Sequence, residues 1–296
     1  MEWHDTRRED PPGMKTIEAR YDASALAYRT WWEPVLAPSA RDLLERLERL
    51  AGRPAGRVLD VGTGAGLLAI EAVRRWPAVE VLGLDGSAEM LGVARATARQ
   101  SLPRSSLARI DWLRGHAERL PFDDASFDLV ISSFAFQLVP RLSVALGEAF
   151  RVLRPGGRLA FVTWRVADDR FAPDEAFEDA LDELESGDDP VELDGEPEEA
   201  RAGDLASAGA TATRLRRIGF RSVVAREAGL AYDHDPGRYL AFLEEYAERE
   251  LFADLSSAER TELRAATERR LAGLPVAAFA WRVPVVYALA RRPGPG

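Results

Sequence analysis

The chain has 296 residues, of which 46% are hydrophobic and 30% are charged, a balance typical of a globular protein that buries a sizeable core. It contains no Cys. This excludes disulfides, thiolate nucleophiles and Cys-based zinc or iron–sulfur sites, and it favours the reducing cytoplasm as the compartment. The polar N-terminus and the lack of an apolar run of about 18 residues predict a protein that is not exported and has no membrane-spanning segment.

The net charge of −10 is unevenly distributed. Residues 168–204 contain 17 acidic residues and two Arg, so this segment carries −15 and the remainder of the chain +5. No stripe of basic residues interleaved with aromatic ones accompanies this mild excess, and we therefore predict no nucleic-acid partner. The acidic segment would favour a cationic or neutral ligand if it lined the entrance to a site, and a solvated face is the alternative.

Two helices are predicted at the start of the chain, one before Pro34 and one after Pro38, where leucines recur at helical spacing. Short apolar runs then alternate with helical patterns. The predicted strands are 58–61, 79–84, 110–115, 127–132 and 158–164, and the helices between them are 67–76, 88–100 and 142–153. This alternation predicts an α/β fold with a parallel sheet and helices on both faces.

The last third of the chain is predicted to contain a helix and a polar loop in residues 165–205, then a helix at 209–218, a strand at 222–228, two or three amphipathic helices in 235–274 and a strand at 283–290. Residues 1–15 and the Pro- and Gly-rich tail 291–296 are predicted to be disordered. We expect a single domain over residues 16–296.

A glycine-rich turn follows the first predicted strand. Asp60 stands near the end of this strand, and Gly62, Gly64 and Gly66 are spaced by two residues. Open α/β sheets bind ligands at the carboxyl ends of their strands, where glycine permits a tight turn and close approach of the backbone. A dinucleotide-binding motif has its third Gly three residues after the second, so the spacing disfavours a nicotinamide cofactor. A purely structural turn is the alternative for this motif alone.

The second strand leads to Asp85, which Gly86 and Ser87 follow. An acidic residue about 20 residues after the glycine turn is placed to accept hydrogen bonds from the ribose hydroxyls of a nucleoside. Capping of the next helix is the alternative for Asp85, although Ser87 could fill that role equally well. The two motifs together favour a nucleoside-containing ligand.

These motifs resemble those of the class I S-adenosylmethionine-dependent methyltransferases, and most closely the small-molecule group that includes the quinone-biosynthesis C-methyltransferases. The resemblance continues in GHAERLPF at 115–122, SFDLVISS at 126–133 and EAFRVLRPGGRL at 148–159, and it covers residues 16–164. It implies a Rossmann-like, doubly wound, mostly parallel seven-stranded sheet whose last strand is antiparallel. It also implies a helical lid at residues 16–50, an acidic insertion at 165–205 and a helical insertion at 235–274, before the last strand.

The resemblance further implies S-adenosylmethionine as the cofactor and a small molecule as the methyl acceptor, and it leaves a homodimer open. The glycine turn would wrap the methionine portion of the cofactor, Asp60 would lie near its ammonium group, and Asp85 would hold the ribose. The cofactor-binding residues implied in this way are Asp60, Gly62, Thr63, Gly64, Gly66, Asp85, Gly86, Met90, His116, Ala117, Glu118 and Ser132. No motif predicts a metal site.

His116 stands where the family commonly has Asp. A neutral imidazole can accept a hydrogen bond from the adenine amino group and a protonated one cannot, so we expect cofactor affinity to fall at acid pH. The alternative is that His116 faces solvent while the amide of Ala117 makes the contact.

The candidates on the acceptor side begin after the fourth strand, where many relatives carry histidines and this chain has Phe134 and Gln137. Phe134 is predicted to wall the acceptor pocket. Gln137 is predicted to orient the acceptor and is a candidate for a catalytic role, although Gln cannot act as a base. Tyr21 and Tyr28 of the lid are the other predicted acceptor-binding residues.

A catalytic base would have to come from the three histidines at positions 4, 116 and 234 if an imidazole is used. His234 is the candidate, because it lies after the predicted sixth strand between Asp233 and Asp235, which would raise its pKa if they are close. A solvated loop histidine is the alternative.

Three functions remain open. Methyl transfer accounts for all of the motifs. A nicotinamide-dependent oxidoreductase would share the fold, but Lys15 is the only Lys in the chain and no Tyr-x-x-x-Lys motif is present. A non-catalytic, S-adenosylmethionine-binding regulatory protein would explain the departures at His116 and Gln137. The sequence does not identify the acceptor or the kind of atom that is methylated.

Overall fold

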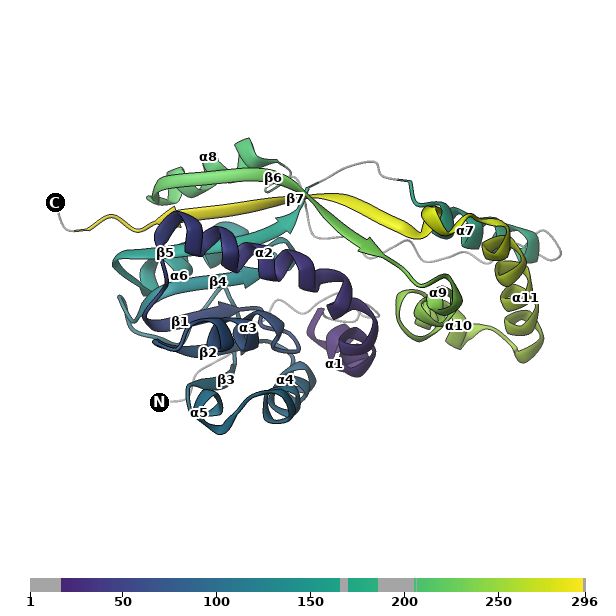
Figure 1. The fold of residues 1–296 in the computed structure, drawn as a ribbon, viewed down its shortest axis with the longest axis horizontal. Coiled ribbons are helices and arrows are strands. Elements are labelled where there is room, and N and C mark those ends of the chain that lie inside the picture. Colours follow the sequence, from purple (N-terminus) through teal and green to yellow (C-terminus); the bar gives the residue numbers. More distant parts are fainter. Residues whose placement is uncertain (1–16, 166–169, 186–204, 206, 295–296) are drawn as a thin grey trace.

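The computed structural model describes residues 17–165, 170–185, 205 and 207–294. These residues form a seven-stranded sheet with the strand order β3-β2-β1-β4-β5-β7-β6 (Figure 1). The strands are β1 (Gly56–Val61), β2 (Val79–Asp85), β3 (Ile110–Arg114), β4 (Phe127–Ser133), β5 (Leu153–Trp164), β6 (Arg221–Asp233) and β7 (Ala280–Arg291). Neighbouring strands pair in parallel except that β7 pairs antiparallel with β5 and β6. The predicted sheet, including its antiparallel last strand, is confirmed.

Alternate side chains of the central strands point to opposite faces of the sheet, as the period of two requires. Val58 of β1 and Ile131 of β4 pack in one cluster with α2 (Glu33–Ala51) and α3 (Leu67–Arg75). Leu59 and Val130, one position away, pack in a second cluster with α6 (Leu142–Val152) and α8 (Ala208–Ile218). Both faces are therefore covered, which explains why these strands are almost continuously apolar.

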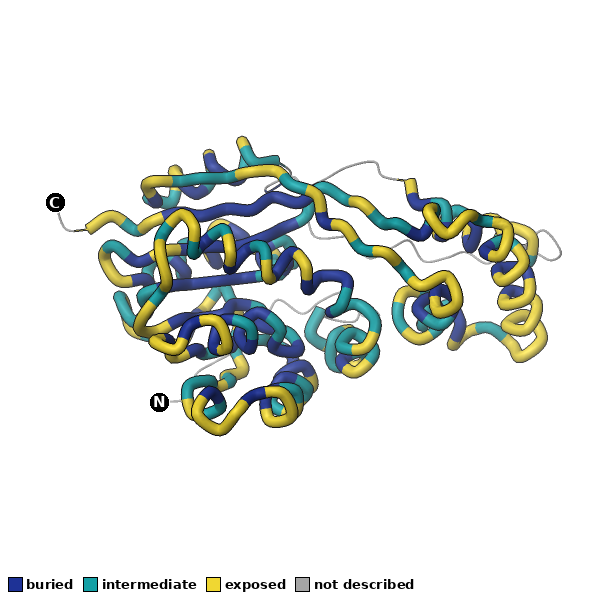
Figure 2. Tube along the Cα trace, in the orientation of Figure 1, coloured by how far each residue is buried: buried dark blue, intermediate teal, exposed yellow. Residues whose placement is uncertain are grey.

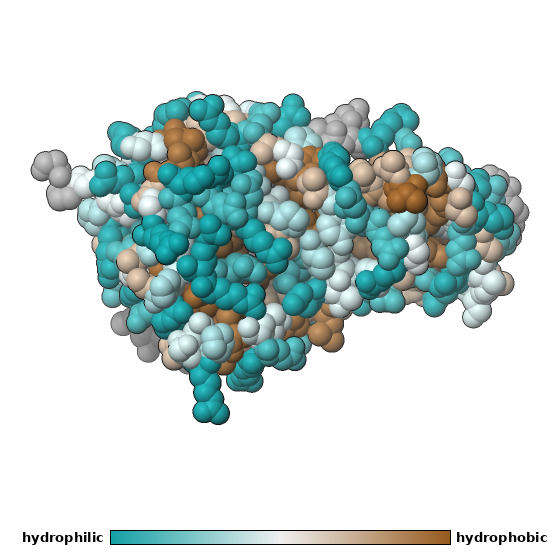
Figure 3. All heavy atoms as spheres, in the orientation of Figure 1, coloured by the Kyte–Doolittle hydropathy of each residue, from teal (hydrophilic) through white to brown (hydrophobic). Residues whose placement is uncertain are grey.

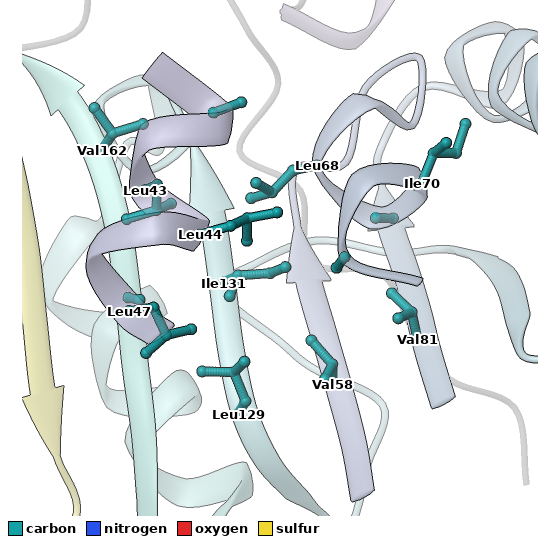
Figure 4. Close-up of a cluster of buried hydrophobic side chains, with 14 of the residues drawn as sticks. Leu43, Leu44, Leu47, Val58, Leu68, Ile70, Val81, Leu129, Ile131 and Val162 are labelled. Carbon is teal, nitrogen blue, oxygen red and sulfur yellow. The ribbon is translucent and has the colours of Figure 1, made fainter. Parts of the chain in front are cut away.

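Helix α2 lies across one face of the sheet and supplies the largest contribution to the first cluster. Figure 4 shows Leu43, Leu44 and Leu47 of this helix facing β1, β4 and β5. All three leucines are at most 1% exposed. Burying a leucine side chain contributes about 1.5–3 kcal/mol, so this face fixes the N-terminal segment on the core.

The boundary predicted between the first two helices, at Pro34 and Pro38, is wrong. Helix α1 (Ile17–Ala27) continues through a π-helical turn, η1 (Tyr28–Trp32), directly into α2. Pro34 lies in the first turn of α2, directly after the irregular π-helical turn. Pro38 lies inside α2, where burial of the apolar face holds the helix together despite the missing hydrogen bond. The irregular turn is η1 instead.

Strands β6 and β7 are longer than predicted and form an arm that leaves the core. The pairing of β5 with β7 ends at Trp164 and Val285, whereas β6 and β7 remain paired with each other as far as Asp233 and Ala280. Figure 1 shows this two-stranded arm projecting from the sheet. Most residues of β6 are half-buried or exposed, so the strand lacks the apolar run by which the others could be recognised.

The arm carries a helical lobe, which we call the distal lobe. It consists of α7 (Ala172–Glu185), α9 (Pro236–Phe242), the π-helical turn η4 (Leu243–Ala247), α10 (Arg249–Asp254), α11 (Ser257–Gly273) and the 3-10 turn η5 (Val276–Phe279). These elements bury their own hydrophobic cluster (Figure 2). The helices predicted within 165–205 and 235–274 are thus confirmed, while the polar loop at 186–204 and the N-terminal residues 1–15 lie outside the described residues.

The prediction of a disordered C-terminal tail is wrong for its first residues. Arg291 belongs to β7. The Arg292 guanidinium donates hydrogen bonds to the carbonyls of Phe150, Arg151 and Leu153, at 3.0, 2.7 and 2.5 Å. These contacts tie the end of β7 to the turn between α6 and β5.

The remaining elements of the core are α4 (Ala88–Ser101), α5 (Arg104–Leu107) and the 3-10 turn η2 (Phe136–Leu138). Among the described residues, no helix has the length and apolar character needed to cross a membrane. The face of the molecule in Figure 3 is largely hydrophilic, with apolar atoms in scattered patches.

Candidate functional site

The glycine turn joins the carboxyl end of β1 to α3. Gly62 has a φ of +67°, and a Cβ atom there would lie 2.1 Å from the Cβ of Ala135, so the turn and the loop after β4 require glycine at this position. Gly64 also has a positive φ, of +54°, but a Cβ there would meet only the ring of Tyr28, at 3.9 and 4.0 Å. Gly62 therefore serves packing, whereas Gly64 faces the lid.

Asp60 is completely buried beside this turn. Its Oδ2 accepts a hydrogen bond of 2.6 Å from the Thr63 hydroxyl, whereas its Oδ1 has no hydrogen-bond partner among the described residues. Burial raises the pKa of Asp60 to about 7, and the nearby Asp85 carboxylate adds to this effect, while the Thr63 hydroxyl and the Ala69 amide act in the opposite direction. A cation at this carboxylate would relieve the cost of its burial.

Asp85 connects the glycine turn with the loop after β2. Its Oδ2 accepts a hydrogen bond of 2.8 Å from the amide of Gly64, and its Oδ1 accepts one of 2.9 Å from the amide of Ser87. Burial nevertheless raises the pKa of Asp85. Because each carboxylate oxygen can accept two hydrogen bonds, Asp85 retains capacity for ligand hydroxyls. Ser87 caps α4 through the amide of Met90, at 3.0 Å, which leaves Asp85 free of the alternative capping role.

The segment implied to contact adenine lies beside Gly86 and helix α1. The Nδ1 atom of His116 lies 3.4 Å from a carboxylate oxygen of Glu18 in α1, and this contact raises the pKa of His116. The side chain is 60% exposed. The carboxylate of Glu118 accepts hydrogen bonds from the backbone amide and the guanidinium of Arg141, both at 2.9 Å. Ala117 packs against the second cluster of the sheet.

Helix α1 is docked onto the cofactor side of the core as the lid was expected to be. Asp22 accepts hydrogen bonds from the Ser87 hydroxyl, at 2.5 Å, and from the amide of Glu89, at 3.1 Å. Tyr21 and Tyr28 make an edge-to-face contact with a centroid distance of 5.9 Å, and Tyr28 lies next to Gly64. The two tyrosines therefore lie on the cofactor side of the lid.

The end of β4 supplies one polar group that sequence analysis missed. Ser132, which was predicted to bind cofactor, donates its hydroxyl to the carbonyl of Val61 at 2.8 Å and is fully buried. Its neighbour Ser133 has a buried hydroxyl without a hydrogen-bond partner among the described residues. A small cavity of about 20 Å³ lies between the lid and the glycine turn, and it is lined by Ser133 and Asp60 together with Glu33 of α2. Glu33 carried no signal in the sequence.

Phe134 and Gln137 follow β4 and contact the end of β5. Phe134 has a positive φ of +53°, which is uncommon for an aromatic residue, and its ring lies 4.2 Å from that of Trp164. The Oε1 atom of Gln137 accepts hydrogen bonds from the Thr163 hydroxyl, at 2.5 Å, and the Trp164 amide, at 3.3 Å. These contacts fix the loop. The side-chain NH₂ group of Gln137 is the part of the residue that remains to bind a methyl-accepting substrate.

Aromatic side chains continue from Phe134 to the arm. The ring of Trp164 lies 5.8 Å from that of Trp281 in β7 and 6.4 Å from that of Trp32 in the lid. All three tryptophans are half-buried. We call Phe134, Trp164, Trp281 and Trp32 the aromatic wall. Sequence analysis identified only Phe134 as part of a pocket, because the strand ends that carry Trp164 and Trp281 are brought together by the sheet.

The expectation that neighbouring carboxylates raise the pKa of His234 is wrong. Asp233 pairs with Arg282 at 2.5 Å, and Asp235 caps α9 through the amide of Gly237 at 2.9 Å. The rings of Tyr232, Tyr239, Phe242, Phe171 and Trp281 surround the imidazole at centroid distances of 4.8–6.4 Å. Burial lowers the pKa of His234 to about 4. The residue is a neutral member of the lobe's apolar cluster and a weak base.

Two acidic residues and a glycine turn lie at the carboxyl ends of adjacent parallel strands, under a helical lid, an arrangement that resembles the cofactor side of class I methyltransferases. A model of the family described as "Methyltransferase domain" matches residues 59–161. These residues are thus a class I, S-adenosylmethionine-dependent methyltransferase domain, and S-adenosylmethionine is the cofactor of that class. Among the described residues, no group of three or more His, Asp or Glu could hold a metal ion.

Curated relatives resemble this core. The ubiquinone/menaquinone biosynthesis C-methyltransferase UbiE of Dinoroseobacter shibae is 45% identical over 114 residues, which are 38% of this chain and 44% of that protein. The malonyl-[acyl-carrier protein] O-methyltransferase of Methylococcus capsulatus is 36% identical over 158 residues, or 52% of this chain and 54% of the relative. The chain therefore spans about half the length of these relatives, and the resemblance to the quinone-biosynthesis methyltransferases is one of the core.

Solved structures share the fold over more of the chain. Phosphoethanolamine N-methyltransferase 2 of Haemonchus contortus, in complex with S-adenosyl-L-methionine, has a TM-score of 0.53 at 19% identity and covers 96% of this chain and 61% of its own. The YcgJ protein of Bacillus subtilis has a TM-score of 0.54 at 19% identity, with 86% of this chain and all of its own covered. At this identity the likeness concerns the fold alone.

Proposed function

We propose that the chain binds S-adenosylmethionine and transfers its methyl group to a small molecule with an apolar ring. The observation that carries the first part is that Asp60 and Asp85 lie on either side of the glycine turn, where the Oδ1 atom of Asp60 has no hydrogen-bond partner among the described residues and only Tyr28 lies near Gly64. These groups fit an ammonium, a ribose and a methionine chain in that order. Bound S-adenosylmethionine would supply a methyl group already activated on a sulfonium.

The protein's own contribution would be to position the reactants and exclude water. Asp85 would hold the ribose, and its two backbone hydrogen bonds fix the carboxylate for that purpose. Alignment of the methyl group and the acceptor supplies much of the lowering of the barrier in such a displacement. Because His234 is a weak base, it would not remove a proton from the methyl acceptor.

The aromatic wall supports an acceptor with an apolar ring. Phe134 and Trp164 stand at the carboxyl ends of β4 and β5, next to the predicted cofactor site; their rings lie 4.2 Å apart, and Trp164 is only half-buried. The name of the relative from Dinoroseobacter shibae, a quinone-biosynthesis C-methyltransferase, is consistent with such an acceptor and favours carbon as the methylated atom. The O-methyltransferase from Methylococcus capsulatus makes a carboxylate the competing acceptor to test.

Calorimetric titration tests the cofactor. We expect micromolar binding of S-adenosylmethionine and S-adenosylhomocysteine, no binding of NAD or NADH, and loss of binding in Asp85→Ala but not in the exposed control Asp111→Ala. Binding of NADH, or of no adenosyl compound, would refute the proposal.

Release of S-adenosylhomocysteine in the presence of hydroquinones or of small carboxylic acids tests the acceptor. We expect turnover with the ring compounds, and in Trp164→Ala a KM for the acceptor raised about tenfold with unchanged cofactor affinity. Turnover with carboxylic acids alone would contradict the role of the wall. Cofactor binding without turnover would favour the regulatory protein instead. We further propose that the chain acts in the cytoplasm, without a nucleic-acid or membrane partner.

A further inference from the structure

A cavity of about 300 Å³ lies where the lid segment meets two helices of the core. This volume is at the lower end of the range for sites that bind small molecules. The lid segment lines it with η1 and α2, and the core lines it with α3 and α4. We call it the seam cavity; its polar lining includes Arg29, Glu33 and Arg41 on the lid side and Glu71, Arg74 and Thr97 on the core side.

The lining of the seam cavity carries an excess of positive charge. Three guanidinium groups stand against two carboxyl groups, a net charge of +1 when both carboxyls are ionised, in a chain whose overall charge is −10. Burial raises the pKa of Glu33 to about 7. The Arg29 and Arg41 guanidinium groups oppose this shift, and Glu71 on the core side adds to it. The charges of the two sides therefore lie close enough to interact.

The arginines of the seam cavity have hydrogen-bond donors to spare. A single oxygen of Glu71, Oε1, lies 3.5 Å from Nη2 of Arg41 and 3.4 Å from Nη1 of Arg74. The Arg41 guanidinium makes no other ion pair or hydrogen bond with the described residues, although a guanidinium has five N–H donors. The two Arg side chains are 56% and 41% exposed, and ion pairs as exposed as these contribute little to stability. Donors thus remain for an oxyanion.

The cavity is apolar beside these charges. Pro34 and Ala37 of α2 and Leu67 and Ile70 of α3 line it as well. Guanidinium groups match the geometry of carboxylates and phosphates, to which they can donate two parallel hydrogen bonds. A ligand with an oxyanion at one end and a short hydrocarbon body at the other therefore fits both parts of the lining.

We propose that the seam cavity binds a small organic oxyanion, a carboxylate or a phosphate monoester with a short apolar body, and that its binding holds the lid segment on the core. An oxyanion between Arg41 and Arg74 would join α2 to α3 by charge-assisted hydrogen bonds, beside the one carboxylate oxygen that they share. Arg29 extends the connection to η1, because its Nε donates to the Thr97 hydroxyl of α4 at 3.4 Å.

The seam cavity is linked to the cofactor side through η1. Arg29 directly follows Tyr28, whose ring lies next to Gly64 of the glycine turn. A ligand that contacts both sides of the seam favours the docked position of the lid, and it would thereby raise the affinity for the cofactor. By linkage, the cofactor would raise the affinity for the anion by the same factor. This second part of the inference rests on the proposed function, whereas the anion site itself does not.

Thermal unfolding of the ligand-free protein tests the site, with butyrate and methyl phosphate as probes at constant ionic strength. At a probe concentration of about 10 mM, binding with a Kd on the order of 1 mM should raise the Tm by roughly 2–5 °C. Butylammonium, which has a similar apolar body and the opposite charge, should cause no such rise. A rise with one of the two anions alone would support the site and identify the class of oxyanion.

Arg41→Gln and Arg74→Gln should each lose at least about half of this rise, because each removes one guanidinium group from the cavity. The matched control is Arg49→Gln, which changes a 68% exposed Arg of α2 outside the lining and should keep the wild-type rise. No rise with either anion, a rise with butylammonium, or an equal rise in the wild type and both cavity variants would overturn the proposal. If one cavity variant does not fold, the other decides.

Calorimetric titration tests the link to the lid. The Kd of S-adenosylhomocysteine should fall about fivefold in the presence of the bound anion in the wild type and in Arg49→Gln, but not in Arg41→Gln. An unchanged Kd with the anion bound would overturn the link to the lid. If the wild type does not bind S-adenosylhomocysteine, the proposed function is refuted, while the shift in Tm still decides whether the seam cavity binds an anion.

Discussion

Replacement of Glu33 by Gln should change how the stability of the protein depends on pH. Burial raises the pKa of Glu33 from 4.5 to about 7, and Glu71 adds to this effect, while Arg29 and Arg41 oppose it. A carboxyl group whose pKa is raised by folding binds its proton more tightly in the folded state. Its contribution to stability is therefore present below the unfolded-state pKa and is lost as the pH rises from 4.5 to 7.

The size of the effect follows from these two pKa values. Ionisation of Glu33 costs the folded state about 0.8 kcal/mol at pH 5 and about 3.3 kcal/mol at pH 8, a difference of about 2.5 kcal/mol. Gln has a similar shape and no charge, so the variant lacks this term. Relative to the wild type, Glu33→Gln should gain about 2.5 kcal/mol of unfolding free energy between pH 5 and pH 8. The effect of the Arg29 ion pair is already contained in the pKa of about 7 and needs no separate correction.

Urea unfolding of the ligand-free protein at pH 5 and pH 8 measures this difference. The wild type and Glu33→Gln are compared with Glu45→Gln, whose carboxylate is 55% exposed on the same helix. We expect the control to follow the wild type at both pH values. Parallel behaviour of Glu33→Gln and the wild type, within about 0.5 kcal/mol, would show that Glu33 is solvated and would refute the reasoning.

Three further predictions concern the glycine turn, the adenine segment and the lobe. Gly62→Ala should destabilise the protein more than Gly64→Ala, by about 1–3 kcal/mol in urea unfolding, because both have a positive φ but only Gly62 contacts a neighbouring Cβ closely; equal losses would contradict this. Glu18 raises the pKa of His116, so cofactor affinity should fall when the pH drops through that raised pKa. Glu18→Gln should move this fall to lower pH. A cofactor affinity that does not change between pH 5 and 8 would rule out the adenine contact. His234→Asn should leave the pH profile of turnover between pH 6 and 8 unchanged, since the imidazole is already neutral there. If the variant instead loses the pH dependence that the wild type shows in this range, His234 acts as a base.

The core of the fold was predictable because its signals are local. A strand buried on both faces reads as an apolar run, and runs such as 58–61 and 127–132 alternate with helices of period 3.6. Asp60 and Asp85 were both predicted to contact the cofactor, because open α/β sheets bind ligands at the carboxyl ends of their strands. In the structure the amide of Gly64 joins the turn beside Asp60 to the carboxylate of Asp85.

The rest of the candidate site depends on tertiary contacts that leave no local trace. Glu33 looks like any acidic residue in the first turn of a helix, and only the packing of α2 over the strand ends buries it. Trp164 and Trp281 are separated by more than a hundred residues and meet because β5 pairs with β7. The arm was too short in the prediction for a related reason: beyond Trp164 its strands have only each other as partners and carry mixed side chains.

His234 shows how neighbours in the sequence can predict a pKa shift in the wrong direction. Its sequence neighbours are both acidic, but Asp233 and Asp235 are bound by Arg282 and by the start of α9. The groups around it come instead from Phe171, just before α7, and from α9, β6 and β7, and they are aromatic. Desolvation without a nearby anion favours the neutral imidazole. If the aromatic wall holds the acceptor as proposed, methyl transfer there proceeds without this histidine as a base.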